Sequence, residues 1–123
     1  MSYAAYNFLH ILGVIFLFMA LGGTIIHVIN GGTKEDNAWR KPLSIIHGIA
    51  MLILLVGGFG LMARIGIDHA AIPGWIWGKL LIWVLLGAAI AIPYRVREWA
   101  KPLALIVPLL GALAAWLAIY QPF

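Results

Sequence analysis

Four long apolar runs constrain the fold of this sequence more than any other feature. They cover residues of about 4–29, 42–63, 73–94 and 102–120. Each is close to the roughly 20 residues that a helix needs to cross a bilayer core about 30 Å thick. The short connections between them force neighbouring helices to run antiparallel. The sequence therefore predicts an all-α, polytopic membrane protein, an up-down four-transmembrane-helix bundle that forms one integral membrane domain over residues 1–123.

The composition favours lipid, not water, as the surroundings of this chain. Of its 123 residues, 64% are hydrophobic and 10% are charged, whereas a soluble domain is about half apolar and about a quarter charged. This number of charges is too small to cover the surface of a globule of this size. Lipid must therefore cover much of that surface. The runs also lack the alternation of apolar and polar residues that is typical of a membrane β-barrel.

Basic residues are distributed unevenly between the two ends of the expected bundle. One end has six of them, and the other has only Arg64 and Lys79. Because basic residues are enriched in cytoplasmic loops, the end with six is expected in the cytoplasm and both chain termini on the other side. The six residues are Lys34, Arg40, Lys41, Arg95, Arg97 and Lys101.

Several classes of function lack the residues that they need. Cysteine is absent, which excludes disulfides, thiolate chemistry and haem attached through a C-x-x-C-H motif. No phosphate-binding loop, dinucleotide fingerprint, hydrolytic triad or H-E-x-x-H motif occurs. The expected spans contain no Asp or Glu, which argues against an acid-driven ion pump. No basic cluster of the kind that binds nucleic acid is present. Because the catalytic motifs are absent as well, a non-catalytic protein is favoured over an enzyme.

His27 and His47 form the first candidate site. His27 is near the end of the first expected helix, and His47 is about one turn inside the second. Antiparallel packing puts them at similar depth, so one interpretation is a haem b site with two histidine ligands, or another metal site. The alternatives are a proton relay, or interfacial histidines that bond to carbonyls, lipid headgroups or Ser44.

His10 and Lys79 form the second candidate site, in the outer part of the bilayer. Ionisable groups at membrane depth usually face the interior of a bundle and mark a site. Together these two residues are candidates to ligate or protonate a bound porphyrin or quinone. The alternative is that Lys79 extends to the outer headgroups while His10 forms a hydrogen bond inside the bundle.

Two short segments carry a resemblance to known families of small bacterial membrane proteins. Residues 8–13 (FLHILG) resemble the Leu-His opening of the HemJ-type protoporphyrinogen oxidases, and also of the SirB-like and the copper-resistance CopD-like families. Residues 77–81 (WGKLL) resemble the Trp-x-x-Lys-Leu pattern of HemJ and SirB, with a different spacing around Trp75 and Trp77. The resemblance implies handling of haem or porphyrin, with His10 and Lys79 at the matching positions. Residues 22–24 (GGT) stand where HemJ-like proteins have a Pro-Arg pair.

We expect a bacterial inner membrane protein with both termini in the periplasm.

Three functions are compatible with these features. The favoured one is a non-catalytic accessory subunit of a larger membrane complex, such as a redox complex, because glycine-rich helices pack well against other subunits, a second copy or lipid. The alternative is a haem b- or porphyrin-binding membrane protein in electron transfer or tetrapyrrole oxidation. A third is a minimal transporter or copper-handling protein that uses Met19, Met51, Met62 and the histidines, since thioether and imidazole ligands suit Cu(I).

Overall fold

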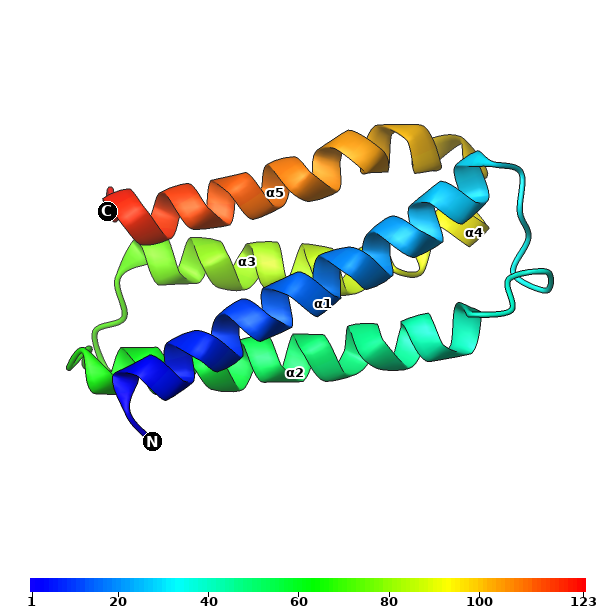
Figure 1. Cartoon of the computed structure of the whole chain (residues 1–123). Coiled ribbons are helices and arrows are strands. Elements are labelled where there is room, and N and C mark those ends of the chain that lie inside the picture. Colours follow the sequence, from blue (N-terminus) through cyan, green and yellow to red (C-terminus); the bar gives the residue numbers. More distant parts are fainter.

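The computed structural model describes all 123 residues, which form helices and no strand. Its elements are α1 (Tyr3–Ile29), α2 (Arg40–Arg64), α3 (Gly74–Ala89), α4 (Ile92–Arg95), the 3₁₀-helix η1 (Arg97–Trp99) and α5 (Ala100–Tyr120). The four long helices lie side by side, with both chain termini at the same end (Figure 1). The loop after α1 and the short helix α4 lie at the opposite end. The all-α fold class is therefore confirmed.

Three helical segments are long and apolar enough to cross a membrane, namely α1, α2 and the segment Arg97–Tyr120 that contains α5. The apolar helix α3 is shorter, with 16 residues. Only 22 of the 123 residues are buried, so many large apolar side chains point outward, among them Leu52 at 63% and Leu105 at 70% exposure. This outer surface is compatible with an integral membrane protein.

Helices α1 and α2 end in the same type of turn. After α1, Gly31 adopts a φ of +86°, which a residue with a side chain rarely tolerates. Its N–H bonds to the carbonyl of Val28, and the N–H of Gly32 bonds to the carbonyl of His27. The same pair of bonds surrounds Gly66, with φ +78°, after α2. These turns satisfy carbonyls that a helix end leaves free, and they reverse the chain.

The third apolar run departs from its expected bounds. Residues 73–94 were expected to form one helix, but α3 ends at Ala89 and α4 begins at Ile92. Pro93 explains the break, because it has no N–H for the Ala89 carbonyl and its ring would clash with that carbonyl. The N–H of Ala91 bonds instead to the Ala88 carbonyl at 3.1 Å. The other three helices begin and end within two residues of the expected bounds.

Glycines allow α1 and α2 to approach closely. A Cβ added to Gly57 would lie 2.9 Å from the backbone nitrogen of His10, and one added to Gly60 would overlap the ring of Tyr6. On the other helix, a Cβ on Gly13 would lie 3.1 Å from the backbone nitrogen of Leu54. Small residues at helix contacts are typical of packing in lipid. This contact therefore fixes the position of the N-terminal half of α1 on α2.

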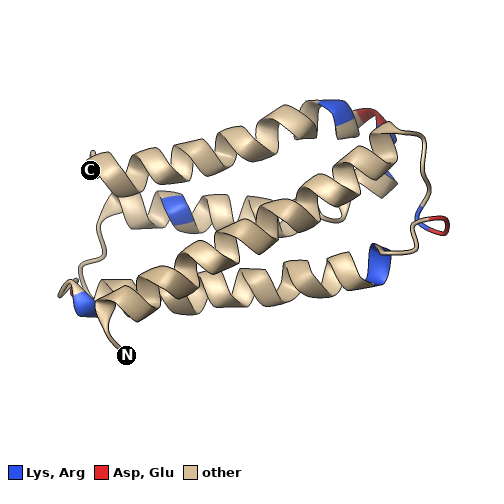
Figure 2. Ribbon diagram, viewed as in Figure 1, with Lys and Arg blue, Asp and Glu red and all other residues tan.

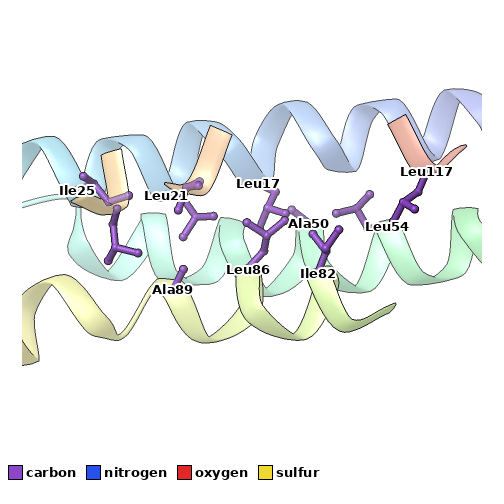
Figure 3. Close-up of a cluster of buried hydrophobic side chains, with 11 residues drawn as sticks. Leu17, Leu21, Ile25, Ala50, Leu54, Ile82, Leu86, Ala89 and Leu117 are labelled. Carbon is purple, nitrogen blue, oxygen red and sulfur yellow. The ribbon is translucent and has the colours of Figure 1, made fainter. Parts of the chain in front are cut away.

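A cluster of buried apolar side chains joins all four long helices (Figure 3). Leu17 and Leu21 of α1 are fully buried at its centre. Leu17, Leu54 and Leu86 also line the larger cavity described below, so the cluster forms one wall of it. The members are Leu17, Leu21, Ile25, Ala50, Leu54, Ile82, Leu86, Ala89, Leu103, Val107 and Leu117.

Candidate functional site

A cavity of about 610 Å³ lies between α1, α2, α3 and α5, in the half of the bundle that carries both termini. Of its 26 lining residues, 19 are hydrophobic, so only a few polar groups can orient a ligand. The volume falls in the range of about 300–1,000 Å³ that is common for small-molecule and cofactor sites. Among the polar lining residues are Asn7, His10, Lys79 and Gln121.

The imidazole of His10 is held in a defined state. Its Nδ1 lies 3.1 Å from the carbonyl oxygen of Leu54. Because a carbonyl only accepts, Nδ1 donates the proton and Nε2 carries a free lone pair. Every fully buried side-chain nitrogen or oxygen in the structure has a hydrogen-bond partner. Because Nε2 of His10 has none, it is not fully buried and faces open space. A metal-ligating histidine typically has this arrangement, with its second ring nitrogen bonded to a carbonyl or carboxylate.

The contact between α1 and α2 places this imidazole. Gly57 lies against the backbone of His10, and a Cβ on Gly58 would lie 3.5 Å from its Cε1. The ring therefore rests on a stretch of α2 without side chains. Leu54, whose carbonyl oxygen accepts the hydrogen bond from Nδ1, lies one turn before these glycines on α2. His10 is thus positioned by helix packing and by one hydrogen bond to the backbone.

Lys79 lines the same cavity and has no charged partner. The structure contains one ion pair, between His27 and Asp36, and no Asp or Glu lines the cavity. Figure 2 shows the basic position of α3, which is Lys79, apart from the charged end of the bundle. An ammonium group in apolar surroundings favours an anionic partner. The structure therefore brings His10 and Lys79, which the sequence predicted as a pair, to one cavity.

Two polar lining residues were missed from the sequence. Asn7 lies three residues before His10 and so on the same face of α1, a spacing that offered a signal. Gln121 lies after α5 with a left-handed φ of 45°, and its side-chain amide donates to the carbonyl of Ala118 at 3.3 Å. Nothing in the sequence indicated that the chain after α5 turns back toward the cavity.

Aromatic side chains complete the wall of the cavity on α3. Trp75 and Trp83 both line it. The indole N–H of Trp83 donates to the carbonyl of Met51 at 3.0 Å, which fixes the ring relative to α2. Flat, immobilised rings give a large contact area at low cost in conformational entropy. The cavity therefore suits a flat apolar ligand with an acidic group.

His27 and His47 have partners elsewhere. Nδ1 of His27 lies 2.8 Å from the hydroxyl of Tyr94, and its Nε2 lies 2.8 Å from Oδ1 of Asp36. Nε2 of His47, a buried residue, donates to the carbonyl of Leu86 at 3.1 Å. Neither histidine lines the 610 Å³ cavity. Their role as ligands of haem iron or another metal stays a prediction, and it requires His27 to release at least one of these bonds.

The residues proposed for copper have different surroundings. Met19 is exposed on the outside of α1, whereas Met62 is buried and lines the 610 Å³ cavity. No group of three or more His, Cys, Asp or Glu residues comes together in the structure. The geometry therefore offers less support for a copper site than for a ligand held by His10 and Lys79.

No family model, curated protein or solved structure matches this chain. The resemblance of residues 8–13 and 77–81 to HemJ-type, SirB-like and CopD-like proteins therefore stays an expectation. Function has to be inferred from the geometry of the chain itself.

Proposed function

We propose that this protein binds haem b or a related porphyrin inside the membrane, in the 610 Å³ cavity. One observation carries the proposal: His10, with a free Nε2, and Lys79, without a carboxylate partner, line the same apolar cavity. Imidazole nitrogen is a common axial ligand of haem iron, and helix bundles readily house haem. This was the alternative function in the sequence analysis, and the geometry now favours it.

The residues of the cavity fit such a group. Nε2 of His10 would be available to hold the iron, and its position is held through the Nδ1 bond to the carbonyl of Leu54. Lys79 is available to pair with a carboxylate of the ligand, because a charge-assisted bond is stronger when water is excluded. The lining, including Trp75 and Trp83, is mostly apolar and therefore disfavours water. A bound haem would supply one-electron redox chemistry, and the chain would orient it and set its surroundings.

The arrangement in the membrane is part of the same proposal. We infer four spans, in which α3, the break and α4 together form the third, over Gly74–Arg95. The bundle end with α4 carries most of the basic residues (Figure 2), which supports a cytoplasmic location for it. Both termini, at the opposite end, would then be periplasmic in a bacterial inner membrane.

Absorption spectroscopy of the purified protein tests the proposal. The wild-type chain, titrated with haemin in neutral detergent, is expected to show a Soret band shifted from that of free haemin. His10→Ala is expected to lose the shifted band but to retain binding of metal-free protoporphyrin, because only haem offers iron to Nε2. Lys79→Gln is expected to lower the affinity for both haemin and protoporphyrin by about tenfold or more, since a charge-assisted bond contributes about 1.5–3 kcal/mol.

His69→Ala is the matched control. His69 lies on the exposed loop between α2 and α3, outside the cavity, so its removal is expected to leave both titrations unchanged. A wild-type protein that stays colourless and binds neither haemin nor protoporphyrin contradicts the proposal. Equal loss of haemin binding in His10→Ala and His69→Ala also contradicts it.

A second candidate function is the accessory subunit of a larger membrane complex, and one feature of α2 favours it. Ser44 and Gly48 are both exposed and four residues apart, and nothing lies within 4 Å of a Cβ added to Gly48. Such a small-xxx-small spacing on an exposed helix surface is typical of helix association. If this face binds a partner subunit, Gly48→Leu is expected to remove a stoichiometric partner that copurifies with the wild-type chain in mild detergent. A wild-type chain that purifies alone contradicts this function.

A further inference from the structure

A second cavity, of about 180 Å³, lies at the opposite end of the bundle and shares no residue with the first. Three cationic side chains line it, Lys34, Arg40 and Arg95. Three hydroxyl-bearing side chains also line it, Thr24, Ser44 and Tyr94. Thr24 donates to the carbonyl of Ala20, and the hydroxyl of Tyr94 bonds to Asn37 and His27, so Ser44 supplies the hydroxyl that is left for a ligand. The cavity therefore combines positive charge with one free hydroxyl, and it has room for a group of a few heavy atoms.

The three cations come from separate parts of the chain. Lys34 lies in the loop between α1 and α2, Arg40 is the first residue of α2, and Arg95 is the last residue of α4. The fold thus gathers like charges at one place, which is unfavourable unless an anion compensates them. Figure 2 shows basic positions on these segments at the same end of the bundle.

No carboxylate compensates these cations. The one ion pair in the structure is between His27 and Asp36, and no Asp or Glu lines the cavity. Asp36 also accepts the backbone N–H of Thr33 at 2.9 Å, so its carboxylate is occupied within its own loop. Arg40 and Arg95 have no protein partner for their guanidinium groups, and both are exposed enough to reach a ligand.

Two features of the backbone add to the positive potential and to the space. Helix α2 begins beside the cavity without a side-chain cap, so the partial positive charge of its N-terminus adds to the potential there. Ile90 and Ala91, which form the break between α3 and α4, line the cavity as well. A continuous helix would not open at this position, so the break caused by Pro93 helps to create the cavity.

We propose that this cavity binds a phosphate-bearing anion, such as the headgroup of an anionic lipid or free phosphate. Arginine is suited to phosphate because its planar guanidinium group donates two parallel hydrogen bonds. Basic pockets between helices at the cytoplasmic face of a membrane bind anionic headgroups in the same way. The site does not depend on the proposed cofactor, because it lies at the other end of the bundle.

Binding of defined lipids to the full-length protein tests this site. The protein in neutral detergent is titrated with phosphatidylglycerol, and separately with phosphatidylcholine, and the complexes are counted by native mass spectrometry. Arg40→Gln with Arg95→Gln is expected to weaken phosphatidylglycerol binding by about tenfold or more. Lys41→Gln with Lys101→Gln is the matched control, because it removes the same charge from the same end without touching the cavity.

Two further variants separate a binding role from a structural one. Arg40→Lys with Arg95→Lys retains the charge but loses the paired hydrogen bonds of the guanidinium groups, so its binding is expected to lie between that of the wild type and that of the Gln variant. Ala91→Leu fills the cavity without changing the charge and is expected to weaken binding, while the far-ultraviolet circular dichroism stays that of the wild type. Such a result assigns the loss to the cavity and not to unfolding.

The source of the anion follows from a calorimetric titration of the lipid-free protein with millimolar inorganic phosphate. Selective binding of phosphatidylglycerol that phosphate does not displace supports the site and identifies a lipid headgroup. Phosphate binding that the Arg40→Gln and Arg95→Gln changes abolish supports the site and identifies the free anion. The proposal is overturned if the wild-type chain binds neither phosphatidylglycerol nor phosphate. It is also overturned if the Arg40→Gln and Arg95→Gln variant and the Lys41→Gln and Lys101→Gln control weaken binding equally.

Discussion

Replacing Gly57 with alanine is expected to push α1 away from α2 and to destabilise the protein. The new Cβ would lie 2.9 Å from the backbone nitrogen of His10 and 3.1 Å from its Cα. Ordinary van der Waals contact begins at about 3.4 Å, so α1 has to move by about 0.5 Å at this point. These atoms belong to the backbone and cannot rotate away. Overpacking of this kind costs about 1–3 kcal/mol in the free energy of unfolding.

Gly48→Ala is the matched control for this measurement. Gly48 lies on the same helix, but nothing lies within 4 Å of its added Cβ. Both substitutions gain the helix propensity of alanine over glycine, up to about 1 kcal/mol, so this gain cancels between the two variants. The difference of about 1–3 kcal/mol then reports the contact with α1 alone.

Reversible unfolding in mixed micelles of neutral detergent and dodecyl sulfate, followed by circular dichroism, measures the two free energies. Gly57→Ala is expected to unfold at a lower fraction of dodecyl sulfate than Gly48→Ala. The close approach of α1 and α2 at His10 is refuted if the two variants have equal stability.

Four further predictions concern the packing and the charges. Leu17→Ala is expected to cost about 2 kcal/mol of unfolding free energy in the same assay, near the low end for a buried leucine because transfer from water contributes little in lipid. Leu52→Ala, at a side chain that is 63% exposed, is expected to change it by less than about 0.5 kcal/mol. Tyr94→Phe removes the hydroxyl bonded to His27, so hydrogen exchange of the loop after α1 is expected to quicken, and unchanged exchange would show that this bond does not hold the loop. A Lys34→Cys variant is expected to react with an impermeant maleimide only after the cells are permeabilised, and labelling of intact cells would reverse the proposed orientation.

The helix bounds could be predicted from the sequence because lipid leaves few options. A chain in the bilayer core must satisfy its backbone hydrogen bonds internally, so an apolar run of about 20 residues has to be a helix. The start and end of α1, α2 and α5 therefore follow from the edges of the apolar runs. The end of α3 does not, because apolar residues continue past it. Pro93 was the available signal, and a proline inside a helical pattern ends or kinks the helix before it.

The candidate site was only partly predictable. His10 and Lys79 stand out in the sequence as ionisable residues inside apolar runs, and the structure places both on one cavity. The cavity itself depends on how four helices pack, which neither residue reveals. Similar depth also suggested a pair for His27 and His47, but depth does not fix which face of a helix a residue occupies. That pair stays a prediction, and in the structure His27 bonds to Tyr94, which is 67 residues away in the chain.

In the proposed membrane location, the shortness of α3 has a consequence for the surrounding lipid. At 1.5 Å per residue its 16 residues extend for about 24 Å, less than the roughly 30 Å of a typical hydrocarbon layer. In the proposed third span α4 continues beyond the break, but the break has backbone groups without helical hydrogen bonds, which are costly in hydrocarbon. Lipids beside α3 would therefore shorten their acyl layer, which brings the break to the polar boundary. The polar boundary of the bilayer would then dip toward Ile90 and Ala91 and bring phosphates to the mouth of the 180 Å³ cavity. A protein with such a locally thinned annulus would insert more favourably into thin bilayers than into thick ones.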